Sequence, residues 1–427
     1  MGVKRVGASH DDYRRGGSGI ISFVNRIGRI RLLAATTALA AGVAALTPAP
    51  VTAEIDKSDN VRRTRSFVYE GVVYPPQASD DYFKGGTDMA FSGRFIYAMQ
   101  QGVDGGVHIV KRTRTKRGHV KVGFVPCPGE QNDVEVVEPG LIAIGYHTSQ
   151  CGVAGGGIRL IDVSRPGKPV YLGSVTFTGG THTLTKYPGK PLIYSSPNGL
   201  GNVRGTEQII DVSNPKKPEV VAAYANRANA CHDLTFYFDA DKKLAFCPGS
   251  DRTEIWDVSD PLAPNPIGEI FNPSIFYHHS AVATHDGKYL VIGDENTEAD
   301  ECEGGTTGAL WVYDITDPTL PKPVSYFGIG RGQAPGSAGS DRESYCTAHL
   351  FNFVPGTYVL VASWYAAGMN VIDFTDPANP VEIGHFFGSG EDYVNYWSAY
   401  WHKGRIYAND RTRGLDIIRP TKDLIPR

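Results

Sequence analysis

The chain has 427 residues, of which 41% are hydrophobic and 20% are charged, and its formal net charge is −3. This balance is typical of a folded globular protein and excludes a chain that is disordered throughout. No run of eighteen or more strongly apolar residues occurs, which excludes a protein with several transmembrane helices. The 50 glycines, 28 prolines, 22 tyrosines and 18 phenylalanines favour many short strands joined by tight turns.

Residues 1–53 have the pattern of a bacterial-type export signal. Three arginines between Arg26 and Arg31 precede the apolar run Leu32–Leu46, and a small-x-small sequence ends at Ala53. A basic segment, a short apolar segment and such a cleavage site are the three parts of a signal peptide. We therefore expect cleavage after Ala53, a secreted extracellular protein, and no integral membrane span after cleavage. The alternative is an uncleaved N-terminal anchor that holds the protein on the outside of the membrane.

The rest of the chain is predicted to hold one domain. Residues 54–65 are expected to be a flexible N-terminal segment, and residues 66–427 a single folded domain, which we expect to be a monomer. After residue 53 the chain carries 35 Lys and Arg residues against 43 Asp and Glu residues. This negative balance makes nucleic acids and anionic membranes poor partners, because both attract positively charged proteins.

A short element recurs along the predicted domain. Its clearest copies are IRLIDVSRP from Ile158, EQIIDVSNP from Glu207, TEIWDVSDP from Thr253, LWVYDITDP from Leu310 and MNVIDFTDP from Met369. In each copy an apolar run ends at Asp, and Ser or Thr and then Pro follow. The Asp and Ser or Thr side chains can hydrogen-bond to nearby backbone N–H groups and form a turn, and proline ends the strand. These aspartates are therefore expected to be structural.

Two further apolar strands precede each copy, separated by turn residues, as in LTKYPGKPLIYSS and VATHDGKYLVIGD. Each unit thus has four antiparallel strands in about 40–60 residues, which is the blade of a β-propeller. The predicted fold class is all-β, a seven-bladed β-propeller, with six or eight blades as alternatives. The blades are predicted to begin near Thr87, Asp133, His182, His232, His279, His349 and Trp397. The last blade lacks a fourth strand, and we expect Ser66–Tyr74 to complete it and close the ring.

The repeats resemble those of the secreted proteins built from LVIVD repeats. The matching segments are Arg159–Asp162, Gln208–Asp211 and Asn370–Asp373, each followed by Val or Phe, then Ser or Thr, then any residue and Pro. The resemblance covers five clear copies and two weak ones, which is nearly all of the chain after the signal. It implies a propeller, and it implies no particular reaction, because one fold can carry many functions.

Four successive predicted blades carry a histidine at the start of the innermost strand: His182, His232, His279 and His349. Innermost strands line the central channel, so these imidazoles are expected to meet at its mouth. Imidazole is a good ligand for Cu, Fe or Zn, and the four histidines are the candidate ligands of a transition metal. The alternative is that they are ordinary channel-lining residues bonded to neighbouring polar groups. His278 is the alternative to His279 as the inward-facing residue.

All six cysteines follow the predicted signal, and an even number in an exported chain favours disulfides. Each falls at the channel-mouth end of a blade, either before an innermost strand or in the loop between the second and third strands. The predicted pairs are Cys127–Cys151, Cys231–Cys247 and Cys302–Cys346. Each is expected to stabilise the fold by about 2–4 kcal/mol. The alternative is that one pair stays reduced and buried.

Two functions fit these features. The first is a binding platform whose loop-rich, disulfide-braced face binds a protein, a glycan or a small molecule. The second is a metal-dependent oxidoreductase with a multi-histidine site, where aromatic residues near the rim form a substrate wall. A structural role in the cell envelope is a third interpretation. The acidic loop Gly293–Gly305 could bind Ca²⁺, although a solvated loop is the favoured interpretation. No nucleophile, phosphate-loop or dinucleotide motif is found, so no catalytic residue is assigned.

Overall fold

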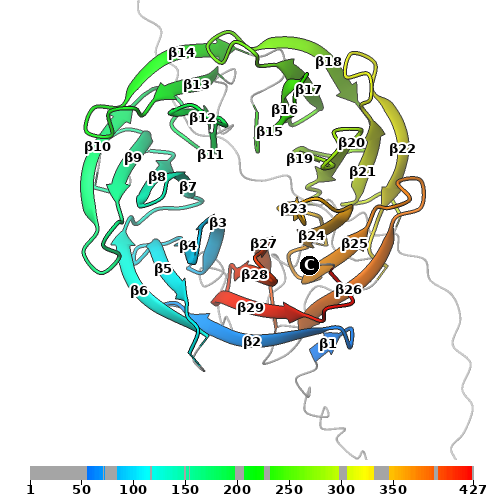
Figure 1. Ribbon diagram of the computed structural model, residues 1–427, viewed down its shortest axis with the longest axis horizontal. Coiled ribbons are helices and arrows are strands. Elements are labelled where there is room, and N and C mark those ends of the chain that lie inside the picture. The colour runs from blue at the N-terminus through cyan, green and yellow to red at the C-terminus, as the bar shows by residue number, and fades with distance from the viewer. Residues whose placement is uncertain are drawn as a thin grey trace, which may run out of the picture. The chain divides into compact units, whose positions relative to one another are not determined.

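The computed structural model describes residues 55–70, 72, 84–115, 118–148, 151–152, 154–197, 206–225, 231–297, 305–330, 346–388 and 393–425. In this part of the chain every regular element is a β-strand, and the strands form seven antiparallel sheets around a common centre (Figure 1). The predicted seven-bladed β-propeller is thus confirmed. The predicted signal lies outside the described residues.

The blades are numbered here in chain order, and their strands run from the innermost to the outermost (Figure 1). Blade 1 consists of β3 (Gly86–Ser92), β4 (Phe95–Gln100), β5 (Gly106–Arg112) and β6 (His119–Pro126). Blade 2 consists of β7 (Asp133–Glu138), β8 (Leu141–Tyr146), β9 (Gly157–Asp162) and β10 (Val170–Thr176). Blade 3 consists of β11 (Thr183–Lys186), β12 (Leu192–Ser196), β13 (Thr206–Asp211) and β14 (Glu219–Ala225). Blade 4 consists of β15 (Thr235–Phe238), β16 (Lys243–Gly249), β17 (Arg252–Asp257) and β18 (Asn265–Phe271).

Blades 5 to 7 complete the ring. Blade 5 consists of β19 (His278–Ala283), β20 (Tyr289–Asp294), β21 (Leu310–Asp314) and β22 (Lys322–Phe327). Blade 6 consists of β23 (Phe351–Phe353), β24 (Val359–Ser363), β25 (Met369–Asp373) and β26 (Val381–Gly388), with β1 (Ile55–Lys57) as a fifth strand beside β26. Blade 7 consists of β27 (Tyr396–His402), β28 (Arg405–Asp410), β29 (Gly414–Pro420) and the N-terminal strand β2 (Val61–Val68).

The repeated aspartates form the turn that follows the third strand, as predicted. In blade 2, the backbone N–H of Ser164 donates to Asp162 Oδ1 at 2.8 Å. The same bond recurs at Asp211, Asp257, Asp314 and Asp373, at 2.7, 2.9, 2.9 and 2.8 Å. In this bond the Asp carboxylate replaces a backbone carbonyl as the acceptor, and it stabilises a turn in which the chain reverses direction within a few residues. The repeats therefore specify blade geometry and not chemistry.

The N-terminal strand β2 pairs antiparallel with β29, from Val61↔Pro420 to Val68↔Gly414. It begins earlier than the segment Ser66–Tyr74 from which we expected the closing strand, and it shares only the residues up to Val68 with it. The strand contains several arginines, which disfavour an internal strand but suit an outermost one whose outer edge is solvated.

The segment 54–65, predicted to be flexible, contains two ordered elements. Strand β1 pairs with β26, and Ile55 is opposite Gly388. Strand β2 begins at Val61, which is 1% exposed, and Arg63 Nη1 lies 3.4 Å from Asp416 Oδ2. The physical reason for the difference is that the edge of each sheet offers unpaired backbone groups, which even a polar segment can satisfy.

The hydrophobic core lies between neighbouring blades. In one cluster, Val107 and Ile109 of blade 1 pack with Ile142 and Ile144 of blade 2, and all four are 0% exposed. Burial of each such side chain contributes roughly 1.5–3 kcal/mol. Because both faces of a blade are covered, the second strand of blade 2, Leu141–Tyr146, is buried along its whole length.

Polar contacts also join neighbouring blades around the channel. In most of them a side-chain hydroxyl donates to a backbone carbonyl of the following blade. The contacts run from Thr87 to Asn132, Thr183 to His232, Thr235 to Ala281, Ser280 to His349, Ser363 to Trp397 and Ser398 to Thr87. Between blades 2 and 3, the backbone N–H of Leu184 donates to Asp133 Oδ2 at 2.6 Å. The histidine-bearing segments are therefore fixed relative to one another.

Candidate metal centre

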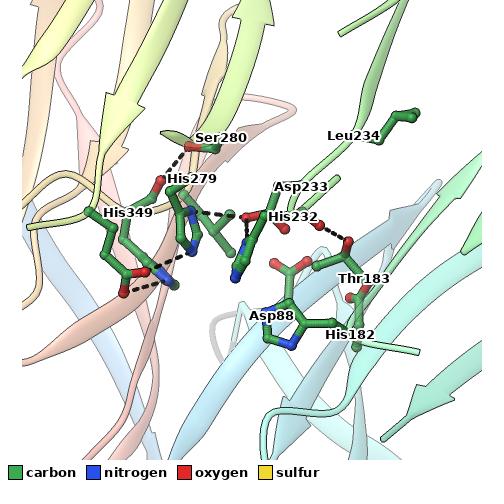
Figure 2. Close-up of polar contacts among 12 residues, drawn as sticks. Asp88, His182, Thr183, His232, Asp233, Leu234, His279, Ser280 and His349 are labelled. Atoms are coloured by element: carbon green, nitrogen blue, oxygen red, sulfur yellow. Dashed lines mark hydrogen bonds and ion pairs between the residues drawn. The ribbon is translucent and has the colours of Figure 1, made fainter. Parts of the chain in front are cut away.

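The four histidines singled out in the sequence lie side by side at one end of the central channel (Figure 2). The ring centroids of His182 and His232 are 4.2 Å apart, those of His232 and His279 are 4.1 Å apart, and those of His279 and His349 are 4.2 Å apart. A fifth histidine, His147, extends the row, with its Nε2 at 2.8 Å from His182 Nδ1. Imidazoles from blades 2 to 6 thus form a continuous arc.

Local backbone structure explains why these side chains face the channel. The backbone N–H groups of His182, His232 and His349 donate to the second strand of their own blades, at 2.8, 2.6 and 3.1 Å. His279 lies at a register shift between His278 and Ser280 in the pairing of β19 with β20. Such a bulge re-aims a side chain without ending the strand.

The same bulge decides which of two adjacent histidines belongs to the site. His278 Nδ1 lies 2.9 Å from Thr253 Oγ1 in blade 4, whereas His279 contacts the other histidines of the arc. Both side chains are buried, at 0% and 2% exposure. His279, and not the alternative His278, therefore faces the channel.

Two carboxylates, which we did not predict as ligands, join the histidines. Asp233 Oδ2 lies 3.0 Å from His232 Nδ1 and 3.0 Å from His279 Nδ1. Glu295 Oε2 lies 3.3 Å from His279 Nε2, and Glu295 Oε1 lies 3.6 Å from His349 Nε2. Figure 2 shows Asp233 between His232 and His279. The result is two groups of two histidines and one carboxylate, whose candidate ligand atoms lie within 4.8 Å of one another.

His349 is held in one orientation. Its Nδ1 lies 2.5 Å from the backbone carbonyl of Trp397, and because a carbonyl only accepts, Nδ1 must carry the proton. In a neutral imidazole Nε2 then carries a lone pair, and that lone pair faces the carboxylate of Glu295. A histidine that donates to a carbonyl through one nitrogen and presents the other is the usual arrangement of a metal ligand.

Glu295 is positioned by a buried tyrosine. Tyr365 Oη donates to Glu295 Oε1 at 2.6 Å, and the tyrosine ring lies 4.5 Å from that of His349. Tyr365 is 1% exposed, and its φ of 40° is in the left-handed region that side-chain-bearing residues rarely adopt. Outliers of this kind concentrate at functional sites.

The charges of the cluster depend on one another. Burial disfavours the charged form of His279, but the carboxylates of Glu295 and Asp233 raise the pKa of His279 above its usual value. Burial raises the pKa of Asp233, yet the charges of His279 and His232 hold it well below its usual range. Burial and the charge of His279 lower the pKa of His349 to about 3. The two carboxylates thus favour the protonated form of His279, and the neighbouring histidines favour the ionised form of Asp233.

The channel beneath the arc is lined with acidic groups. A cavity of about 20 Å³ at the mouth borders His182, His232, His279 and His349, and a second cavity of about 380 Å³ shares Asp88, Asp133 and Asp233 with it. Burial raises the pKa of Asp88 to about 6 and that of Glu135 to about 7. The small cavity is of ionic dimensions, and the larger one has room for a small organic molecule.

Other predicted features are distributed differently. Trp364 and Tyr396 are buried at 1% exposure or less and belong to the core, whereas Tyr365, equally buried, contacts Glu295 and His349 of the site. In the acidic loop, Asp294 is 0% exposed and accepts the backbone N–H groups of Phe276 and Tyr277 at 2.8 and 3.0 Å. The first two acidic residues of that loop are therefore structural or part of the site. Residues 298–304, which include Cys302, lie outside the described residues.

Two disulfides are present, Cys127–Cys151 and Cys231–Cys247, and they are two of the three predicted pairs. Disulfides are consistent with an extracellular protein, because cytosolic thiols are kept reduced. The third predicted pair includes Cys302 and stays a prediction. Among the described residues, no helix is long and apolar enough to cross a membrane.

Comparison with known proteins agrees with the fold. The family model of the LVIVD repeat matches residues 353–387, which include the end of β23, all of β24 and β25, and most of β26. No curated protein matches the sequence. The matched segment forms blade 6, and the other blades repeat its arrangement of strands. The chain therefore contains a segment that matches the LVIVD repeat, and it has the fold of a seven-bladed β-propeller.

Proposed function

We propose that the protein is a metal-dependent oxidoreductase whose metal binds at the mouth of the propeller channel. The observation that carries this proposal is the convergence of His232, His279 and His349 with Asp233 and Glu295, at separations of 3.0–3.6 Å. Donor atoms that share a tetrahedral metal lie roughly 3.3 Å apart when each bond is about 2.0–2.1 Å long. Within each of the two groups of two histidines and one carboxylate, the side chains thus already have the spacing of ligands around one ion.

The chemistry of the donors supports a redox metal. Two histidines and one carboxylate are the ligand set of non-haem iron oxygenases, in which the remaining positions stay open for other molecules. Ferrous iron is therefore the metal we favour, and copper and zinc, which also accept imidazole, are the alternatives. His182, with its ring 4.2 Å from that of His232, is close enough to supply a further nitrogen.

The channel supports action on a small molecule. Its cavity of about 380 Å³ shares Asp88, Asp133 and Asp233 with the cavity at the mouth, so a molecule in the channel would lie beside the metal. We propose that the substrate is small and carries a group that can bond to carboxyls.

Metal analysis of the purified protein tests the proposal. The expected result is binding of Fe²⁺, Cu²⁺ or Zn²⁺ to the wild type and its loss in His279→Ala. His278→Ala is the matched control, because His278 is an adjacent buried histidine that faces Thr253, and it should bind metal like the wild type. No binding by the wild type would refute a metal centre.

The redox assignment needs a separate measurement. Nitric oxide binds ferrous iron that has an open position, and the complex has a distinctive electron paramagnetic resonance spectrum. We expect this spectrum from the iron-loaded wild type. A protein that binds zinc tightly but gives no nitrosyl complex with iron would be a metalloprotein without the proposed oxidoreductase function.

A second proposed function is a binding platform, and the observation that favours it is the position of the two disulfides. Each joins the segment before an innermost strand to the end of the second strand or the loop after it, which braces the loops on the face of the metal centre. We propose that this face binds a protein or a glycan outside the cell. Binding to a glycan array that survives His279→Ala but is lost in Cys231→Ser would support this function, and no binding by the wild type would count against a glycan ligand.

The export signal is also a proposal. We propose that residues 1–53 direct secretion and are removed after Ala53. N-terminal sequencing of the protein recovered outside the cell tests this, and the expected first residue is Glu54. Recovery of the intact chain in the membrane fraction would favour the anchored alternative.

A further inference from the structure

One imidazole occupies the centre of the candidate metal site. His279 Nδ1 lies 3.0 Å from Asp233 Oδ2, and His279 Nε2 lies 3.3 Å from Glu295 Oε2. These are the two different nitrogens of the ring, so each carboxylate contacts its own ring nitrogen. His279 therefore has a carboxylate at each of its two possible ligand atoms.

Each carboxylate also has a histidine of its own. Asp233 lies beside His232, at 3.0 Å, and Glu295 lies beside His349, at 3.6 Å. The two groups of possible metal ligands, His232–Asp233–His279 and His279–Glu295–His349, share His279 alone. In a site with one metal ion, the ion would bind one nitrogen of His279, and the carboxylate at the other nitrogen would only orient the ring. The histidine beside that orienting carboxylate would then have no role in the site.

We propose that two metal ions bind here, one at each edge of the His279 ring, and that His279 bridges them as an imidazolate. This inference rests on the proposed function. Asp233 and His232 complete the ligands of the first ion, and Glu295 and His349 complete those of the second. With metal–nitrogen bonds of about 2.0–2.1 Å, the two ions would be roughly 6 Å apart.

The exchange of charge is balanced. Coordination at both nitrogens of His279 requires a ring without either N–H proton, so each proton that the ring carries leaves to solvent, and the ring becomes an anion that both ions share. Asp233, Glu295 and the imidazolate then carry three negative charges against four positive ones. Asp88 and Asp133 border the same cavity, and loss of a proton from one of them would offset the remaining positive charge. Both ions are held by residues of blades 4 to 6, whose innermost strands are joined by the Thr235 and Ser280 hydroxyl contacts.

The test counts ions with Zn²⁺ on the metal-free full chain, by equilibrium dialysis and elemental analysis. The wild type should bind two ions. Glu295→Gln and Asp233→Asn should each bind one, because each removes the carboxylate of one ion and leaves the other group complete. Glu135→Gln is the control, since Glu135 lines the deeper cavity and not the cavity at the mouth, and it should still bind two. Thermal unfolding of each variant checks that it is folded.

A spectroscopic measurement tests the bridge itself. With Cu²⁺, an imidazolate couples the electron spins of two ions, so the doubly loaded wild type should lose the ordinary spectrum of isolated Cu²⁺. Glu295→Gln, with one ion, should show that ordinary spectrum. Binding of a single ion by the wild type, or of two uncoupled ions, would overturn the bridge. If the wild type binds a single ion and His279→Ala binds none, the bridge is refuted but the proposed metal-dependent function stands. If the wild type binds no ion, both the bridge and the proposed function are refuted.

Discussion

Removal of the Tyr365 hydroxyl should weaken metal binding without dismantling the site. Tyr365 Oη donates to Glu295 Oε1 at 2.6 Å, and the tyrosine is 1% exposed, so water cannot readily replace the donor. A hydrogen bond to a charged group contributes about 1.5–3 kcal/mol, which corresponds to roughly 10–100-fold in a dissociation constant. Loss of a partner that orients a metal ligand has an effect of the same size. Tyr365→Phe should therefore bind metal about 10–100-fold more weakly.

The measurement is a competition titration against a chromophoric chelator, with Tyr400→Phe as the matched control. Tyr400 Oη donates to Asp88 Oδ1 at 2.7 Å, so this variant loses the same kind of bond to a channel carboxylate that belongs to neither group of candidate ligands. Its metal affinity should change by less than about threefold, within 0.6–0.7 kcal/mol. Equal losses in the two variants would refute the reasoning that Tyr365 acts through Glu295.

Three predictions concern the fold. Burial and the charge of Lys121 lower the pKa of His108 to about 3, below the value of about 6.5 in the unfolded chain, so its contribution to stability is present above pH 6.5 and decreases as the pH falls. Urea unfolding should show that the wild type loses about 2 kcal/mol relative to His108→Gln between pH 7.5 and pH 5, and parallel losses would contradict this. Gly268→Ala should destabilise by about 1–3 kcal/mol, because a Cβ there would overlap the carbonyl oxygen of Pro318. Gly167→Ala, where the nearest atom lies 3.6 Å away, should cost less than half as much in the same assay. Cys231→Ser, which opens a loop with a sequence separation of 16, should lower the free energy of unfolding by about 3 kcal/mol, and an unchanged value would show that the bridge is dispensable.

The blade repeat could be predicted from the sequence because its signals are local. A strand that ends at Asp257 and is followed by Ser and Pro needs only neighbouring backbone groups, and the Ser259 N–H bond at 2.9 Å supplies the turn. The beginning of the closing strand could not be predicted in the same way. Strand β2 is determined by the free edge of β29, and that partner is far away in the sequence.

The candidate site was predicted in part for a similar reason. The four histidines repeat at the starts of successive blades, so one fold assumption brings them together. Asp233 directly follows His232 in the sequence, and this adjacency was an available signal. Glu295 is one of six acidic residues in a single loop, and no local pattern distinguishes it from the others. Contacts within the folded structure, such as the hydrogen bond from Tyr365 and the pairing of His278 with Asp294, place it against His279 and His349.

The pairing of β2 with β29 has a consequence for how the molecule is made. Tyr69 Oη donates to Asn409 Oδ1, at a sequence separation of 340 residues. A nascent chain that lacks its C-terminal strands therefore cannot close the ring of blades. Until the C-terminal strands leave the ribosome, β2 lacks its partner β29. Blades 1 and 6 then each have one face that no neighbouring blade covers. Contacts of such long range form slowly and leave strand edges exposed in the meantime. A nascent chain of this protein should therefore depend on chaperones until its final residues emerge.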